Sequence, residues 1–176
     1  MNTIYTIGHS TRTLNELIAA LHAHHITTLV DIRSYPGSRR LPQFNRESME
    51  RSLPEVGIRY VWEKRLGGRR KKILAESPNT GLRNDSFRNY ADHMLTPEFQ
   101  QGAADVLKLA EESPTAIMCA ERVWFQCHRM LVSDYYVANG VDVRHIDAEG
   151  PTKPHKLTKE AKMIDGRLVY RAESLF

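Results

Sequence analysis

The feature that most constrains the fold is an alternation of short β-branched stretches with amphipathic helical stretches. Residues 3–7 are β-branched or aromatic, which is typical of a strand, and residues 27–32 repeat this pattern. Between them, Thr13 and Glu16 have the spacing of a capping box at the start of an apolar helical face. A strand, a helix of about three turns and another strand predict a parallel βαβ unit with a right-handed crossover.

The same alternation continues to about residue 146. We expect further elements at these positions: a helix over 46–53, a strand over 58–62, a helix over 86–95, a helix starting at Pro97, a strand over 115–118, a helix over 126–138 and a strand over 141–146. This order predicts a doubly wound α/β fold, with a mostly parallel sheet of about five strands and helices on both faces.

The length of 176 residues fits a single α/β domain over residues 1–176. Two segments lie outside the alternation: a basic loop at about 64–84 and a C-terminal extension from about 150. An Asp-Gly pair at 165–166 predicts a tight hairpin within this extension.

Basic residues gather between Arg33 and Lys72, where 12 Lys/Arg stand against 4 Asp/Glu, although the whole chain has a net charge of only +4. A basic block on a mildly acidic remainder indicates an anionic partner, either a small molecule or a nucleic acid. A solvated surface without a partner is the alternative.

The block is densest over residues 64–72, where Gly67 and Gly68 permit close approach of a ligand to the backbone. Six basic side chains form the candidate nucleic-acid patch: Lys64, Arg65, Arg69, Arg70, Lys71 and Lys72. Aromatic residues nearby could stack on bases or pack in the core: Tyr60, Trp62, Phe87 and Tyr90.

The chain has no apolar run approaching the roughly 20 residues that cross a bilayer, and its N-terminus lacks a signal-peptide pattern. Its two cysteines are too few for a disulfide framework. We therefore expect a cytoplasmic protein without membrane contact, in which both thiols are reduced.

In doubly wound folds, ligands bind beyond the carboxyl ends of the strands. Three of the expected strands end in chemically rich residues: His9 and Ser10; Asp31, Arg33 and Ser38; and Cys119 and Glu121, followed by Cys127, His128 and Arg129. A parallel sheet brings these ends to one edge, so we expect the side chains of His9, Arg33 and Glu121 to converge on one pocket.

Catalytic roles are expected for Cys119, Glu121, His9 and Asp31. A thiol facing a helix N-terminus acquires a lowered pKa and becomes a nucleophile, whereas an isolated cysteine is more often a small buried hydrophobe. In a dry pocket the pKa of Glu121 would rise to suit a general acid or base; the alternative is a structural carboxylate paired with an arginine. His9 is expected to act as acid, base or anion donor, or to be a helix-start residue bonded to the backbone. Asp31 is expected to be an orienting residue more than a catalyst, paired with Arg33 or with Arg129.

Substrate binding is expected to rely on the helix that starts near Gln126, since free N–H groups and an arginine fork there would hold an anion beside Cys119. The expected binding residues are Ser10, Arg33, Ser38, Gly67, Gly68, Cys127, His128 and Arg129. One or two of the three residues at 127–129 are expected to face the pocket, and Cys127 is the one expected to be buried.

Zinc has suitable ligand types here in Cys119, Cys127, His128 and His9, but the chain has no Cys-x2-Cys knuckle and no second close pair. We expect no metal and no cofactor. A redox disulfide between Cys119 and Cys127 is an open alternative.

Several motifs occur together in order: Thr-Ile-Gly-His-Ser at 6–10, Val-Asp-Ile-Arg-Ser-Tyr-Pro-Gly-Ser at 30–38, Leu-Gly-Gly at 66–68, Cys-Ala-Glu at 119–121 and Cys-His-Arg at 127–129. With these motifs, residues 3–150 resemble the family called Domain of Unknown Function 488. The resemblance implies an α/β domain with a polar pocket and no settled reaction. The segment between Glu121 and Cys127 departs from the family pattern, because it lacks the usual proline.

Three functions are consistent with these features. The first is a hydrolase or transferase acting on an anionic substrate, a nucleotide or nucleic acid, with Cys119 as nucleophile and Glu121 as acid or base. The second is a non-catalytic nucleic-acid-binding module that uses the 64–72 patch. The third is a thiol redox sensor.

Overall fold

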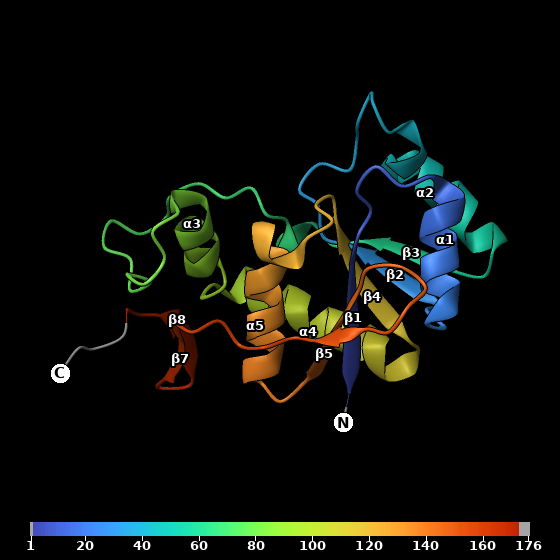
Figure 1. Cartoon of the computed structure of the whole chain (residues 1–176). Helices are drawn as coiled ribbons and strands as arrows, with labels where there is room; N and C mark the ends of the chain where they lie inside the picture. The colour runs from blue at the N-terminus through green and yellow to red at the C-terminus, as the bar shows by residue number, and fades with distance from the viewer. Residues whose placement is uncertain (1, 173–176) are drawn as a thin grey trace.

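The computed structural model describes residues 2–172 (Figure 1). Its strands are β1 (Thr3–Gly8), β2 (Thr28–Asp31), β3 (Arg59–Trp62), β4 (Thr115–Cys119), β5 (Asp142–Ile146), β6 (Lys153–Pro154), β7 (Ala161–Ile164) and β8 (Arg167–Tyr170). Its α-helices are α1 (Leu14–Ala23), α2 (Arg46–Glu55), α3 (Asp85–His93), α4 (Pro97–Glu112) and α5 (Arg129–Ala138). No helix of this described part is long and apolar enough to cross a membrane.

The main sheet has the strand order β3-β2-β4-β1-β5-β6. The first five strands run parallel, and β6 pairs antiparallel with β5. The mostly parallel α/β sheet is therefore confirmed. The strands β1 and β2 of the expected βαβ unit run parallel, and β4 lies between them and pairs with both.

Helices cover both faces of the sheet, as predicted. Ala116 and Met118 of β4 pack in a core cluster with α1 and α2, whereas Ile117 and Cys119 point into the core under α3, α4 and α5. All five residues of β4 are buried, as is usual for a parallel strand that is covered on both faces. Residues at the end of one strand are thereby directed to opposite sides of the sheet.

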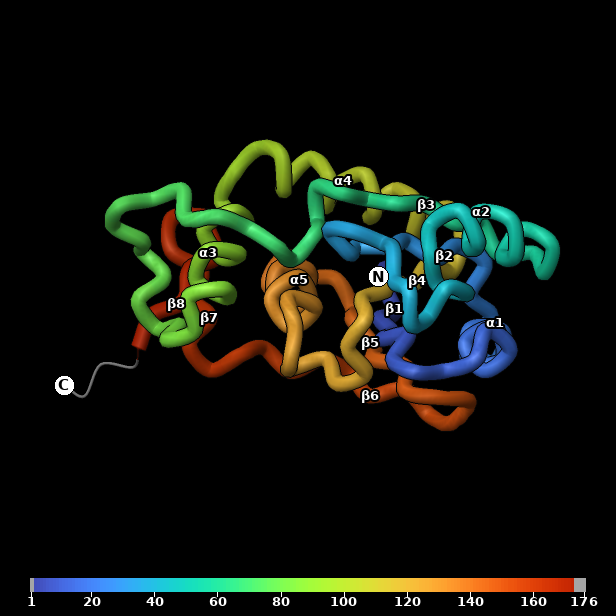
Figure 2. The backbone as a smooth tube through the Cα atoms, turned by 90° about the horizontal axis from the view of Figure 1, so that it is seen from above, coloured from blue at the N-terminus to red at the C-terminus, as the bar shows by residue number. Residues whose placement is uncertain are grey.

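The predicted hairpin is present in the C-terminal extension. Strands β7 and β8 are joined at Asp165 and Gly166, and both residues have positive φ, at 52° and 76°. Such a pair is the signature of the tight two-residue turns that join antiparallel strands. The hairpin and α3 lie at one end of the molecule, away from α1 and α2 (Figure 2).

Helix α5 begins at Arg129, three residues later than the expected start near Gln126. A short 3-10 turn occupies Trp124–Gln126, and Cys127 is fully extended, with φ −143° and ψ 176°. An extended residue interrupts helical hydrogen bonding, so the α-helix starts only after it.

Candidate thiol site

A cavity of about 510 Å³ lies beyond the carboxyl ends of β2 and β4. We call it the thiol cavity. It is lined by Arg33, Ser34, Tyr35, Gly68, Arg69, Ser86, Phe87, Cys119, Ala120, Glu121, Gln126, Cys127 and His128. Seven of the residues that were predicted from the sequence to form a pocket or a basic patch line this cavity: Arg33, Gly68, Arg69, Cys119, Glu121, Cys127 and His128.

The two cysteines form a close pair in the wall of this cavity. Their sulfur atoms are 3.0 Å apart, and both residues are buried. The Sγ atom of Cys127 also accepts a hydrogen bond from the backbone N–H of Arg129 at 3.4 Å, at the first residue of α5. Cys119 Sγ also lies 3.5 Å from the carbonyl oxygen of Glu121, so its one S–H is shared between this carbonyl and Cys127 Sγ.

These contacts polarise the pair. The hydrogen bond from Cys119 is the main cause that lowers the pKa of the Cys127 thiol to about 7; burial opposes it, and the Arg129 guanidinium and N–H assist it. The same hydrogen bond and burial raise the pKa of Cys119 well above its usual range. This direction is the opposite of the expected acidic Cys119, because Cys127 and not Cys119 is the cysteine next to the N-terminus of α5.

Arg129 is buried, with 1% of its surface exposed. Its Nη2 donates to the carbonyl oxygens of Glu121 at 3.0 Å and of Arg122 at 2.9 Å. The guanidinium therefore clamps the segment that follows β4. Arg129 does not line the thiol cavity.

The first N–H groups of α5 are also occupied. The N–H of Arg129 donates to Cys127 Sγ, and that of Met130 donates to the carbonyl of Cys127 at 3.1 Å. The expected anion site at free N–H groups beside Cys119 is therefore not formed by these two groups, because the extended Cys127 supplies acceptors for both.

Glu121 lies at the rim of the thiol cavity and is exposed. Its backbone carbonyl accepts the bonds from Cys119 and Arg129, and no hydrogen bond or ion pair of its carboxylate is found within residues 2–172. The expected dry environment of Glu121 is therefore wrong, since the chain turns outward at Ala120. Gly8 permits this turn: a Cβ atom there would lie 1.7 Å from the Glu121 carbonyl oxygen.

Asp31 and Arg33 form a buried ion pair, with Arg33 Nη2 2.6 Å from Asp31 Oδ2. Tyr60 donates its hydroxyl to the same carboxylate at 2.5 Å, and Arg33 also donates to the carbonyl of Phe44 at 2.7 Å. Of the two arginines expected as partners of Asp31, Arg33 is the one that binds it. Most of the donors of Arg33 are consumed by these contacts, although its side chain still reaches the thiol cavity.

His9 joins this cluster rather than the cavity. Its Nδ1 donates to the carbonyl of Ser10 at 2.8 Å, its Nε2 accepts from Arg33 at 3.3 Å, and its ring packs at a tilt against Phe44. Burial lowers the pKa of His9 to about 4, so the ring is neutral at pH 7. Arg33 and Glu121 line one cavity as expected, but His9 lies behind Arg33 and does not line it.

The remaining predicted binding residues hold loops. Ser38 caps the turn to Leu41, since its hydroxyl accepts the Leu41 N–H at 3.3 Å. Gly67 and Gly68 pack closely: a Cβ at Gly67 would approach Ser34, and one at Gly68 would lie 2.4 Å from Nδ1 of His128. Of these, Gly68 lines the thiol cavity, whereas Ser10, Ser38 and Gly67 do not.

The basic patch does not form one free surface. Arg65 pairs with Glu63 at 2.8 Å and with Asp105 at 2.7 Å. Arg70 donates to three backbone carbonyls of its own loop, from Lys64, Arg65 and Gly67. Exposed basic side chains remain at Lys64, Arg69, Lys71 and Lys72, and of these only Arg69 lines the thiol cavity.

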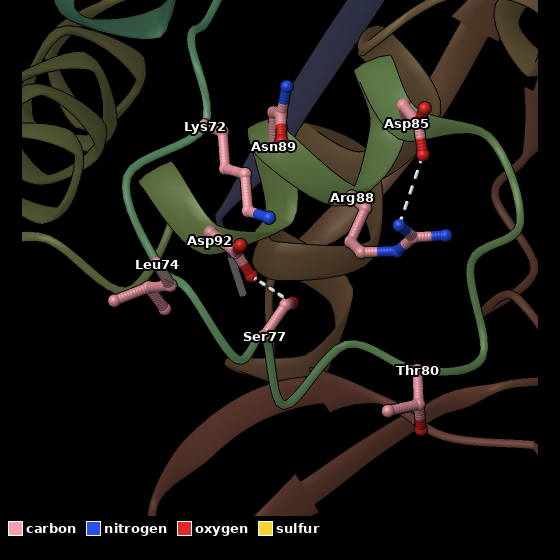
Figure 3. Close-up of a pocket in the computed structure, with 8 residues that line it drawn as sticks. All are labelled: Lys72, Leu74, Ser77, Thr80, Asp85, Arg88, Asn89 and Asp92. Atoms are coloured by element: carbon pink, nitrogen blue, oxygen red, sulfur yellow. Dashed lines mark hydrogen bonds and ion pairs between the residues drawn. The ribbon is translucent and has the colours of Figure 1, made fainter.

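Lys72 instead lines a separate cavity of about 510 Å³ between its loop and α3 (Figure 3). The buried Asp92 carboxylate there accepts hydrogen bonds from Ser77 at 2.5 Å and from Asn79 at 2.7 Å. Arg88 pairs with Asp85 at 3.0 Å along the helix. These contacts fasten the 72–80 loop to α3 and thereby fix one side of the basic segment.

A buried chain of hydrogen-bonded polar side chains was not predicted from the sequence. His145 Nε2 is 2.8 Å from His155 Nδ1, His155 Nε2 is 2.7 Å from Asp134 Oδ1, and Tyr170 donates to Asp134 Oδ2 at 2.8 Å. The four residues come from β5, the β6–β7 connection, α5 and β8. No local sequence pattern marks such a chain, because only the tertiary fold brings its members together. Within residues 2–172, no group of three or more His, Cys, Asp or Glu residues has a metal-binding arrangement.

The fold and the site define an α/β protein with a parallel sheet and a polarised thiol pair at its carboxyl edge. The family model described as Domain of unknown function DUF488 matches residues 13–136, so the chain belongs to this family. Comparisons with curated proteins and with solved structures give no match.

Proposed function

We propose that the protein is an enzyme acting on an anionic substrate, a nucleotide or a nucleic acid, with the Cys127 thiolate as its nucleophile. The observation that carries this proposal is the thiol pair, in which Cys127 has a pKa of about 7 and lines a cavity. A nucleophile poised near ambient pH combines a high thiolate fraction with good reactivity.

The chemistry would be a displacement in two steps. The Cys127 sulfur forms a bond to an electrophilic centre of the substrate, while the leaving group departs with its electron pair and takes a proton from water. Water or an acceptor group then breaks the new bond to sulfur, loses a proton and regenerates the thiolate. Water as acceptor makes the enzyme a hydrolase, and another acceptor makes it a transferase.

The rim of the thiol cavity supports the choice of substrate. Tyr35 is 69% exposed, and the Arg69 guanidinium lies 5.8 Å from the centre of its ring. Phe87 is half-buried on the same rim. Exposed aromatic faces beside an arginine suit stacking on a base with a contact to its phosphate.

Protection from alkylation tests this proposal. Iodoacetamide labels Cys127, and the rate is measured by mass spectrometry with and without mononucleotides or a short single-stranded oligonucleotide. A substrate in the thiol cavity is expected to slow labelling at saturating concentration. The Arg69→Ala variant is expected to require about fivefold more ligand for the same protection, the upper scale for an exposed charge.

Arg39 offers a matched control, because it is an exposed arginine of the same basic block outside the cavity. The Arg39→Ala variant should be protected like the parent. No protection by any of these ligands would contradict the choice of substrate, and equal losses in both arginine variants would assign the effect to net charge alone.

A thiol redox switch is the second candidate, favoured by the 3.0 Å separation of the two sulfur atoms. Peroxide would oxidise Cys127 to a sulfenic acid with release of water, and Cys119 would displace a second water to form a disulfide. Mild peroxide treatment would then lower the mass of the intact chain by about 2 Da, the two thiol hydrogens. Stable mass under conditions that oxidise control thiols would remove this candidate.

A further inference from the structure

A second cavity, of about 480 Å³, lies between the segment that follows β4 and the end of β5. We call it the Trp124 cavity. It is lined by Arg122, Val123, Trp124, Phe125, Arg129, His145, Ile146, Asp147, Ala148, Gly150, Pro151 and Lys153. It shares no lining residue with the thiol cavity.

Arg129 gives this cavity a buried cation without a counter-ion. Within residues 2–172 no carboxylate lies in ion-pair range of Arg129, and its Nε atom is buried without a hydrogen-bond partner. The three contacts of its other nitrogens are to neutral oxygens: two backbone carbonyls and, at 3.5 Å, the Thr6 hydroxyl. A buried charge of this kind is unfavourable until an anion compensates it.

The nearby acids are already engaged. Asp147 binds Arg122 at 2.9 and 3.0 Å, and Asp134 accepts from His155 and Tyr170. Lys153 adds another cation to the wall. The wall therefore carries three cationic side chains and one carboxylate, which leaves an excess of positive charge.

His145 lines the Trp124 cavity as an uncharged ring. Its Nδ1 is 2.5 Å from the Thr6 hydroxyl, and its Nε2 faces His155, so both nitrogens are occupied inside the protein. Burial and the neighbouring His155 and Arg129 lower its pKa to about 3, and the ring is neutral at pH 7.

The same cavity has a flat aromatic wall. The Trp124 ring stacks on His145 with centroids 4.6 Å apart and an angle of 3°. Phe125 stands edge-on to Trp124 at 5.3 Å and is 54% exposed. A large apolar ring exposed beside a cationic pocket is typical of a small-molecule site, where apolar walls bind the ligand body and a few polar groups fix its orientation.

We propose that the Trp124 cavity binds a small organic phosphate monoester, with its dianionic phosphate between Arg129 and Lys153 and its planar organic part against Trp124 and Phe125. The dianion matches the excess charge of the wall. This site is separate from the thiol cavity and adds a second ligand to the protein.

Trp124 supplies its own optical probe, because the chain has only one other tryptophan, Trp62. In a Trp62→Phe background, phenyl phosphate is expected to change the Trp124 fluorescence saturably at concentrations below about 10 mM. Phenol, which lacks the charge, should bind at least about tenfold more weakly, and inorganic phosphate, which lacks the ring, should also bind more weakly.

Lys153→Ala should weaken binding of phenyl phosphate about fivefold, and the matched Lys156→Ala, an exposed lysine outside the cavity, should leave it unchanged. Arg69→Ala should also leave it unchanged, which separates this site from the thiol cavity. No saturable change with phenyl phosphate would overturn the proposal, as would equal affinities of the Lys153→Ala variant and the parent. Equal affinities for phenyl phosphate and inorganic phosphate would overturn the aromatic part of it.

Discussion

Replacing Cys119 by alanine is the sharpest perturbation of the thiol pair. The variant removes the hydrogen bond that chiefly lowers the pKa of Cys127, while the Arg129 contacts remain. We therefore expect the pKa of Cys127 to rise from about 7 toward its ordinary value of 9.

The expected change in rate follows from this shift. At pH 7 the thiolate fraction would fall from about one half to about one hundredth, a factor of about 50. A more basic thiolate is intrinsically more nucleophilic, and with a Brønsted slope of about 0.45 this recovers a factor of about 8. The net result is alkylation about sixfold slower at pH 7, with a higher plateau above pH 9.

The assay is the rate of iodoacetamide labelling from pH 5 to pH 10, read by mass spectrometry. The variant has a single thiol, so the profile belongs to Cys127 alone. The Cys127→Ala chain is the control and should label slowly at pH 7, because burial alone keeps the pKa of Cys119 high. An unchanged midpoint in Cys119→Ala would refute the reasoning, since the hydrogen bond between the sulfurs would then have no effect on Cys127.

Three further predictions concern stability. Asp31→Ala should lower the free energy of unfolding by about 3–5 kcal/mol, because it leaves a buried arginine uncompensated, whereas Asp147→Ala at an exposed pair should cost less than about 1 kcal/mol in the same urea titration. The pKa of His9 is about 4 in the folded chain and 6.5 in the unfolded chain, so protonation favours the unfolded chain. His9 therefore contributes up to about 3 kcal/mol to the free energy of unfolding above pH 6.5, and this contribution should be lost as the pH falls through 4. A urea midpoint that does not change between pH 7 and pH 4 would contradict this. Gly68→Ala should lower the melting temperature through contact with an imidazole ring, while Gly150→Ala, where a Cβ meets nothing within 4 Å, should not; equal melting temperatures would show that the loop shifts without strain.

The elements of this fold were predictable from local signals. The β-branched stretch before Gly8, the capping box at Thr13 and the Asp-Gly turn at 165–166 each determine structure within a few residues. The position of β4 between β1 and β2 was not predictable in this way, because it depends on packing between residues about a hundred positions apart.

The sequence predicted which residues lie at the candidate site better than it predicted what each of them does there. Parallel strand ends meet at one edge, which is why Cys119 and Arg33 could be placed together from sequence. Their roles depend on details of one or two residues: the extended Cys127 delays α5 and takes the position at its N-terminus, and the outward turn at Ala120 exposes Glu121. Such details arise from tertiary contacts that a linear pattern does not contain.

The central position of β4 has a consequence for how the chain folds during synthesis. Strand β1 pairs with β4 and β5, both of which follow it by more than a hundred residues, so its hydrogen-bonding groups have no strand partner while the first 110 residues emerge. The pair of β2 and β3 can form early, but it is joined to β1 only through β4. Folding that depends on pairing between segments distant in the sequence is slow, and its intermediates expose strand edges that associate with other chains. A ribosome-bound chain ending before Thr115 should therefore be a strong ligand for chaperones, and its release should coincide with the emergence of the strand that carries Cys119.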